Sequence, residues 1–272
     1  MCYTKAMTFN APKKSLGQNF LTSIPARIAI TKAGNLTEKD TVLEIGPGRG
    51  FLTEELLSTG ATVVALEKDR DLVPHLTEKF ENIPTFSIIE GDALTFNPSS
   101  LCNIGNKKLP STTYGLQAAP YKLIANIPYY ITGAILSKYL SSDHQPSQMV
   151  VLVQKEVAER VVAKDNKESI LSLAVKAYGI PKIVYRVNKG SFNPIPKVDS
   201  AVLSIEHISR ENFLSKTHEE TFFKVIKSGF AHKRKFLISN LREVFPNINL
   251  PELFKELNLR ETIRAENVTL ET

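Results

Sequence analysis

The residues best suited to catalysis lie in a short motif at 124–130, Ile-Ala-Asn-Ile-Pro-Tyr-Tyr. The Asn126 side chain and the Ile127 backbone carbonyl can together accept two hydrogen bonds from one amino nitrogen. Adenine N6 is a poor nucleophile because its lone pair is delocalised into the ring, and two acceptors favour the pyramidal nitrogen that attacks a methyl group. Pro128 stiffens the loop, and Tyr129 offers an aromatic face to a flipped-out base. The motif therefore indicates methyl transfer to an amino nitrogen.

A glycine-rich loop follows an apolar run in the segment T-V-L-E-I-G-P-G-R-G-F-L-T at 41–53. Gly46, Gly48 and Gly50 allow a sharp turn and let a ligand approach bare backbone at the end of a strand. The spacing is G-x-G-x-G, because position 51 is Phe, whereas a dinucleotide site requires G-x-G-x-x-G. It is more typical of the S-adenosylmethionine loop of class I methyltransferases. A tight turn with incidental glycines is the alternative.

Carboxylates follow the next two predicted strands. Glu67 could accept hydrogen bonds from both hydroxyls of a ribose, although a solvent-facing strand end is also possible. Asp92 could accept one from the amino group of a bound adenine. Glu90 is its near neighbour, and the sequence leaves open which of the two carboxylates points inward.

The elements that must position these residues alternate between short β-branched runs and longer helical stretches over residues 41–205. This alternation predicts an α/β fold with a mostly parallel sheet. The last two strands are joined by a stretch too short for a crossover helix, so we expect them to form an antiparallel edge pair. Seven strands are the number expected of a Rossmann-like class I methyltransferase. The strands are expected at 41–45, 62–67, 85–89, 122–125, 148–153, 183–188 and 201–206, and helices at 25–33, 51–58, 70–80, 132–140, 155–163 and 169–178.

Two domains are predicted. Residues 1–206 would form the catalytic, cofactor-binding domain with a basic amino-terminal segment, and residues 207–272 a small all-helical domain that recognises RNA. Apolar residues recur at helical spacing after residue 206, without a further strand pattern. The stretch 97–120 has no clear period and is expected to be a surface insertion.

Positive charge is concentrated at the two ends of the chain. Lys and Arg number 34 against 28 Asp and Glu, a formal charge of +6, which suits a polyanionic partner. Lys13 and Lys14 lie in a segment without acidic residues. Lys233, Arg234 and Lys235 form a cluster at a predicted helix start, where charge and free N–H groups could hold phosphate. We expect all five residues to bind RNA, with a solvated surface as the alternative.

Composition argues against several other classes of protein. The two Cys are a hundred positions apart and the five His share no spacing with carboxylates, so we expect neither a disulfide framework nor a metal site. Every apolar run is far shorter than the roughly eighteen residues needed to span a bilayer. The amino terminus lacks the apolar stretch of a secretory signal. A cytoplasmic, monomeric protein without a membrane partner is expected.

Four strings, taken together, resemble the ribosomal RNA adenine dimethyltransferase family. They are K-S-L-G-Q-N-F-L at 14–21, E-I-G-P-G-R-G at 44–50, N-I-P-Y-Y-I-T at 126–132 and F-N-P-I-P-K-V-D-S-A-V at 192–202. The resemblance implies N6,N6-dimethylation of two adjacent adenosines near the 3′ end of small-subunit (16S) rRNA, with S-adenosylmethionine as donor and a role in small-subunit biogenesis. It implies that the base is held between Phe192 and Tyr129. The cofactor residues expected are Gln18, Asn19, Leu21, Glu44, Gly46, Gly48, Glu67, Asp92 and Asn126.

Other functions stay open at this point. One is the related large-subunit rRNA adenine N6-methyltransferase that confers macrolide resistance, and another is a DNA adenine methyltransferase. The first and last of the four strings favour the small-subunit enzyme. An alternative of a different class is a ribosome-assembly factor whose binding matters more than its methylation. The expected mechanism is in-line methyl transfer driven by positioning, desolvation and Asn126, without a general base or a metal.

Overall fold

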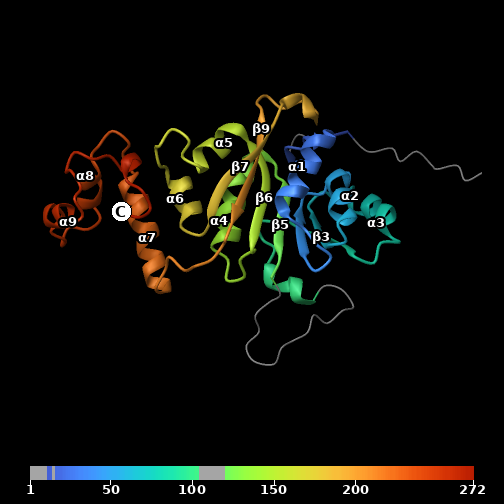
Figure 1. The fold of residues 1–272 in the computed structure, drawn as a ribbon, viewed down its shortest axis with the longest axis horizontal. Coiled ribbons are helices and arrows are strands. Elements are labelled where there is room, and N and C mark those ends of the chain that lie inside the picture. The colour runs from blue at the N-terminus through green and yellow to red at the C-terminus, as the bar shows by residue number, and fades with distance from the viewer. Residues whose placement is uncertain (1–10, 14–15, 104–119) are drawn as a thin grey trace, which may run out of the picture.

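A computed structural model of the chain describes residues 11–13, 16–103 and 120–272, and a seven-stranded sheet lies at its centre (Figure 1). The strand order is β4-β3-β2-β5-β6-β9-β7. The strands from β4 to β6 are parallel, and β9 is antiparallel to both β6 and β7. This arrangement confirms the predicted fold class and the antiparallel edge pair. The strands are β2 (Thr41–Ile45), β3 (Thr62–Glu67), β4 (Phe86–Glu90), β5 (Lys122–Asn126), β6 (Gln148–Gln154), β7 (Ile180–Val187) and β9 (Ser200–Glu206).

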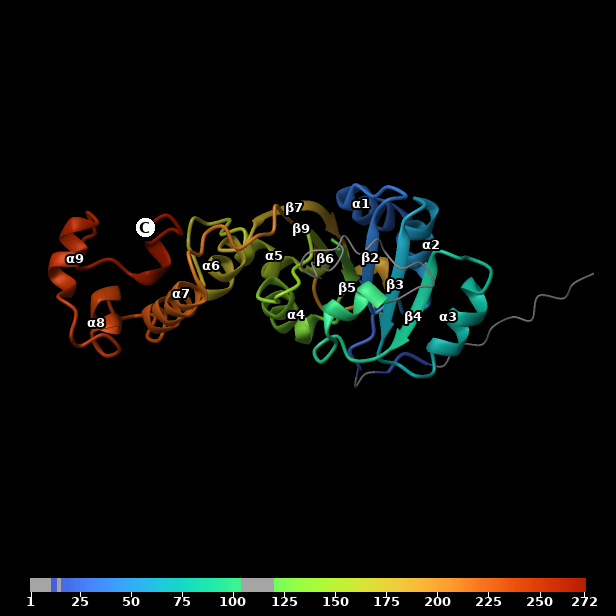
Figure 2. The ribbon, with the colours of Figure 1, turned by 90° about the horizontal axis from the view of Figure 1, so that it is seen from below.

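Helices cover both faces of the sheet (Figure 2). Central strands bury both faces, because alternate side chains of a strand point to opposite sides. In β6, Met149 and Val151 face the cluster formed with α4 to α6, whereas Val150 and Leu152 face α1 and α2. The helices are α1 (Ile24–Gly34), α2 (Phe51–Ser58) and α3 (Val73–Phe80) on one side, and α4 (Thr132–Leu140), α5 (Lys155–Val161) and α6 (Ile170–Lys176) on the other.

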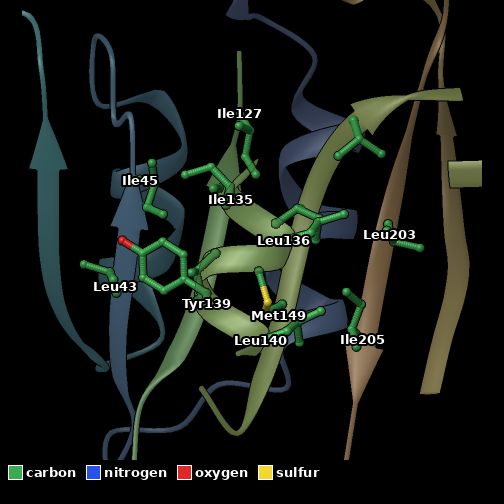
Figure 3. Packing of buried hydrophobic residues seen from close by; sticks show 14 of the residues in the cluster. Leu43, Ile45, Ile127, Ile135, Leu136, Tyr139, Leu140, Met149, Leu203 and Ile205 are labelled. Atoms are coloured by element: carbon green, nitrogen blue, oxygen red, sulfur yellow. The ribbon is translucent and has the colours of Figure 1, made fainter. Parts of the chain in front are cut away.

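The largest part of the core lies between the sheet and α4 (Figure 3). Ile135, Leu136 and Tyr139 point from this helix onto the strands and are fully buried. The Tyr139 hydroxyl donates to the Ala93 carbonyl at 3.2 Å, which satisfies the one polar atom of this buried ring. The packing fixes the segment that follows β5, and that segment carries the predicted catalytic motif.

Two predicted boundaries differ from the structure by three residues, and the other differences are of one or two residues. The helix expected from residue 70 begins at Val73, because a turn closed by the Leu72 N–H and the Asp69 carbonyl precedes it. The strand expected from residue 183 begins at Ile180, which pairs with Glu206. Pro181 lies in this extension, and it is tolerated because β7 is an edge strand.

A second, two-stranded sheet was absent from the sequence prediction. β1 (Phe20–Leu21) pairs antiparallel with β8 (Phe192–Asn193), with Leu21 opposite Phe192. Two residues are too few for a periodic pattern, so no strand signal exists in either segment. The pairing joins the string at 14–21 to the string at 192–202, although 171 positions separate Leu21 from Phe192.

The carboxyl-terminal segment is helical, as predicted, with α7 (Lys216–Gly229), α8 (Leu237–Arg242) and α9 (Leu250–Glu256). Its own apolar cluster includes Leu237, Leu241 and Phe254. The prediction that the 233–235 cluster lies at the start of a helix is wrong. That cluster lies in the turn before α8, and Phe236 is 43% exposed. The described helices include none long and apolar enough to cross a membrane.

Candidate active site

The loop after β2 forms the floor of a pocket at the carboxyl ends of the parallel strands. Gly46, Gly48 and Gly50 all have positive φ (67°, 60° and 78°), a conformation that glycine adopts without strain. A Cβ added to Gly48 would lie 3.0 Å from the Phe20 ring, and one at Gly50 would lie 2.8 Å from the Phe80 ring. A Cβ added to Gly46 would meet nothing nearer than the Asn126 carbonyl oxygen, at 3.8 Å, so there is open space beside the backbone of this glycine.

Most of the predicted cofactor and catalytic-loop residues lie around this pocket, although they come from five separate segments of the chain. The amino-terminal segment covers one side, and the ends of β2, β3, β4 and β5 form the other. The predicted residues that line it are Gln18, Asn19, Gly46, Gly48, Glu67, Asp92, Asn126 and Pro128.

Glu67 ends β3 and is only 6% exposed. Its Oε2 accepts from the Gly48 N–H at 3.1 Å, and its Oε1 accepts from the Asp69 N–H at 2.8 Å. Burial raises the pKa of this carboxyl, and the two N–H donors oppose that rise. The glycine loop therefore fixes the orientation of a buried carboxyl group that lines the pocket.

The structure resolves the choice between the two carboxylates after β4. Asp92 lines the pocket, where its Oδ2 pairs with the Lys68 ammonium at 2.9 Å and its Oδ1 accepts from the Leu94 N–H at 2.9 Å. These hydrogen bonds hold the pKa of Asp92 below its ordinary value. Glu90 instead pairs with Arg70 at 2.7 Å on the exposed strand end.

The Asn126 side chain is oriented by the amino-terminal segment. Its Nδ2 donates to the Asn19 carbonyl at 3.2 Å, and among the described residues Oδ1 has no hydrogen-bond donor, so this oxygen can accept from a ligand. Tyr129, two residues after the buried Ile127, is half-buried, and its hydroxyl shares a hydrogen bond with Ser200 Oγ at 2.6 Å. Burial raises the pKa of the Tyr129 hydroxyl. The motif thus combines an oriented amide with a phenol ring tied to β9.

Five of the predicted catalytic and cofactor residues do not line the pocket. One is Ile127, whose side chain is 1% exposed and packs in the cluster against α4. Leu21 and Phe192 are paired across β1 and β8 and buried in the cluster against α1, so Phe192 is only 3% exposed. Tyr129 lies outside the lining, so its role with Phe192 at the target base stays a prediction. Glu44 is buried beneath the loop, where its Oε2 accepts from the Thr53 hydroxyl at 2.7 Å. Burial raises the pKa of Glu44 to about 8.

Other lining residues were missed from the sequence. Phe20, Lys68 and Tyr130 contribute to the pocket, and Tyr130 is 63% exposed. The Arg49 guanidinium lies over the Phe20 ring, 4.6 Å from its centroid. Phe20 lies in the string at 14–21 and Tyr130 in the string at 126–132. The presence of an aromatic residue in each string was the sequence signal that could have identified them as pocket residues.

The Lys13 ammonium lies between Asp69 Oδ1 at 2.5 Å and Asp71 Oδ2 at 2.7 Å. The Gln18 amide donates to the other oxygen of Asp69 at 2.7 Å. These contacts favour a role for Lys13 in fixing the amino-terminal segment over the predicted role in binding phosphate. Lys14 lies outside the described residues.

The predicted phosphate cluster before α8 is solvent-exposed. Lys235 pairs with Glu243 at 2.8 Å, whereas Lys233 and Arg234 form no ion pair with the described residues. The turn is held because the buried Asn240 amide donates to the carbonyls of Gly229 and His232. RNA binding by this cluster stays a prediction. No group of His, Cys, Asp and Glu that could hold a metal occurs in the described part of the chain.

A sheet of this order, with a glycine loop after the first parallel strand and an amide-bearing motif after β5, defines a class I methyltransferase. Residues 9–272 match the family model described as ribosomal RNA adenine dimethylase. The chain belongs to this family, and it is an rRNA adenine methyltransferase.

Individual relatives agree with the family assignment. Ribosomal RNA small subunit methyltransferase A of Dehalococcoides mccartyi is 41% identical over 85% of this chain and 75% of its own length. A dimethyladenosine transferase from Plasmodium falciparum is 25% identical, with a TM-score of 0.73 over 92% of this chain and 93% of the other. The 23S rRNA methyltransferase ErmE is 24% identical and also has a TM-score of 0.73, over 93% of this chain and 96% of the other. The fold alone therefore does not distinguish an enzyme that acts on small-subunit rRNA from one that acts on large-subunit rRNA.

Proposed function

We propose that this enzyme dimethylates N6 of two adjacent adenosines near the 3′ end of small-subunit rRNA, in the cytoplasm and on the small subunit or its precursor. The observation that carries the chemistry is the orientation of Asn126, whose Nδ2 is engaged by the Asn19 carbonyl. The small-subunit assignment is supported by the D. mccartyi relative and by the strings at 14–21 and 192–202.

The residues of the pocket fit S-adenosylmethionine. Glu67 would accept from the ribose hydroxyls and Asp92 from the adenine amino group. The open backbone at Gly46 would allow a ligand to approach closely, as its added Cβ would meet nothing nearer than 3.8 Å. Glu44 Oε1 is buried below the loop and has no hydrogen-bond partner in the described structure, so it is a polar atom with which a bound ligand could form a hydrogen bond. When bound, S-adenosylmethionine supplies an electrophilic methyl group on a sulfonium.

The chain's own groups would act chiefly through position. Asn126 Oδ1 and the Ile127 carbonyl would accept the two N6 hydrogens, which localises the nitrogen lone pair toward the methyl group. Tyr129 would stack on the flipped base while its hydroxyl stays bound to Ser200. The N6 proton would pass to water after the attack. No side chain needs to act as a general base.

The test uses undermethylated small ribosomal subunits, with large subunits and duplex DNA as rival substrates. We expect dimethyladenosine, detected by mass spectrometry, only in the small-subunit rRNA. Asn126→Ala should lower turnover about a hundredfold or more while the affinity for subunits stays nearly unchanged. Methylation of the large subunit instead, or full turnover by the variant, would contradict the proposal.

The assembly-factor alternative is tested in cells. If methylation is the essential act, the Asn126→Ala variant should reproduce the ribosome-assembly defect of a deletion strain. Full rescue of that defect by the inactive variant would show that binding matters more.

A further inference from the structure

Four cations lie beside the predicted catalytic motif, around Asp199, the residue just before β9. The Lys155 N–H donates to the Asp199 carbonyl at 3.0 Å, and the Lys189 N–H donates to Asp199 Oδ1 at 2.9 Å. Arg186 stands opposite Ala201 in the register of β7 and β9. The fourth cation, at position 197, precedes Asp199 by two residues. We call Lys155, Arg186, Lys189 and Lys197 the edge cations.

The sheet register places the edge cations at the same edge as the target nitrogen. Gln154 and Val187 both pair with Ser200, so the end of β6, the end of β7 and the start of β9 coincide. β6 is parallel to β5, where Asn126 pairs with Leu152. The Tyr129 hydroxyl binds Ser200 directly. In Figure 1 the start of α5 and the loop between β7 and β9 lie together at the upper edge of the sheet.

The edge cations are exposed or half-buried, and none forms an ion pair with another described residue. Other cations of the same domain are paired, including Lys68 with Asp92. The nearby carboxylates are Glu156, Glu159 and Asp199. Of these, Glu159 is bound by Lys164 at 2.6 Å, and the hydrogen bond from Lys164, with added attraction from Lys155 and Arg186, lowers its pKa. The field at this edge is therefore positive.

Exposed apolar side chains flank this positive edge. Ile195, in the loop between Lys189 and Lys197, is 66% exposed, and Tyr130 is 63% exposed at the mouth of the pocket. Sites for single-stranded nucleic acid combine cations along the backbone with side chains on which bases rest. Neighbouring strands lie about 4.8 Å apart, so the span from β5 to β7 is about 15 Å, enough for a few nucleotides.

We propose that the edge cations bind the phosphates of the unpaired RNA strand on one side of the target adenosine, and so hold that strand while the base enters the site. The proposal rests on the proposed function, because it requires an RNA substrate. It differs from binding by the 233–235 cluster, which belongs to another part of the chain. Single-stranded RNA fits better than a duplex, since the target base must leave its helix before reaction.

The test compares two double variants that remove the same charge. Lys189→Gln with Lys197→Gln removes two edge cations, and Lys32→Gln with Lys39→Gln removes two exposed, unpaired lysines. The controls lie near the opposite edge of the sheet. Lys32 is in the last turn of α1, and the carbonyl of Gly34, which ends that helix, accepts from the Lys122 ammonium at the start of β5. A variant with all four edge cations replaced by Gln extends the series. Binding to undermethylated small subunits, methylation and S-adenosylhomocysteine affinity are measured for each.

We expect the edge double variant to bind subunits about tenfold more weakly at physiological salt. The slope of log affinity against log salt should flatten by about 0.7 for each phosphate that is no longer bound, and S-adenosylhomocysteine affinity should not change. The control pair should match the wild type. Equal subunit affinity in both double variants would overturn the proposal, as would weaker binding without a change in slope, which would indicate contact with protein. Failure of the wild-type protein to methylate small subunits at all would overturn the proposed function, and this proposal with it.

Discussion

Glu44 makes a specific prediction about how stability depends on pH. The carboxyl group is 1% exposed, and one of its oxygens has no hydrogen-bond partner among the described residues. Burial raises its pKa from 4.5 to about 8, although the hydrogen bond from Thr53 opposes the change. Below pH 4.5 both the folded and the unfolded chain carry the proton. Between 4.5 and about 8 only the folded chain keeps it, so unfolding releases a proton and stability falls as the pH rises.

The size of this effect follows from the interval between the two pKa values. One proton corresponds to a slope of about 1.4 kcal/mol per pH unit. The free energy of unfolding should therefore lose about 3 kcal/mol between pH 5 and pH 7.5 through Glu44 alone, which is a large part of the stability of an ordinary domain. Glu67, whose pKa is also raised by burial, acts in the same direction.

Glu44→Gln removes the titration and keeps an acceptor for the Thr53 hydroxyl. Urea unfolding of the cofactor-free protein at several pH values between 5 and 8 should show a slope reduced by about 1.4 kcal/mol per pH unit in the variant. An unpaired amide adds a cost that does not vary with pH, so the slope carries the test. Glu38→Gln, at an exposed position, is the control. Parallel pH profiles for the wild type and Glu44→Gln would refute the reasoning.

Three further predictions concern the glycine loop, the cofactor and RNA. Gly50→Ala should lower the free energy of unfolding by about 2 to 4 kcal/mol, because the residue has positive φ and its Cβ would collide with Phe80. Gly46→Ala should lower it by only about 1 to 2 kcal/mol and should chiefly weaken S-adenosylhomocysteine binding. Scanning and titration calorimetry of both variants measure the two effects. Glu67→Ala should weaken cofactor binding by about 1 to 3 kcal/mol. An unchanged S-adenosylhomocysteine affinity in titration calorimetry would show that Glu67 does not bind the cofactor. Replacing the 233–235 cluster by Ala should weaken RNA binding and flatten its salt slope by about 0.7 to 0.9 for each phosphate released, with cofactor affinity unchanged as the control.

The sequence predicted the parallel sheet well, because central strands and their crossover helices depend on apolar periodicity that each segment carries by itself. The ranges of β2, β3, α2 and α4 agree with the prediction at both ends. Local periodicity carries no information about contacts between distant segments. The pairing of Leu21 with Phe192 and the ion pairs of Lys13 were therefore beyond reach, and an apparently free lysine proved to be bound to Asp69 and Asp71.

The same long-range contacts bring two strings that are far apart in the chain side by side next to the pocket. The amino-terminal string supplies Asn19, whose carbonyl holds the Asn126 amide at 3.2 Å. One residue later, Phe20 pairs with Asn193, in the loop that also carries Lys189 and Lys197. A displacement of either segment would be transmitted through β1 and β8 to the other, and through Asn19 to the Asn126 amide. A loss of about 1 Å in the placement of a reacting group can cost about a hundredfold in rate, so we expect substitutions that break these few hydrogen bonds to lower turnover even though they leave the pocket lining intact.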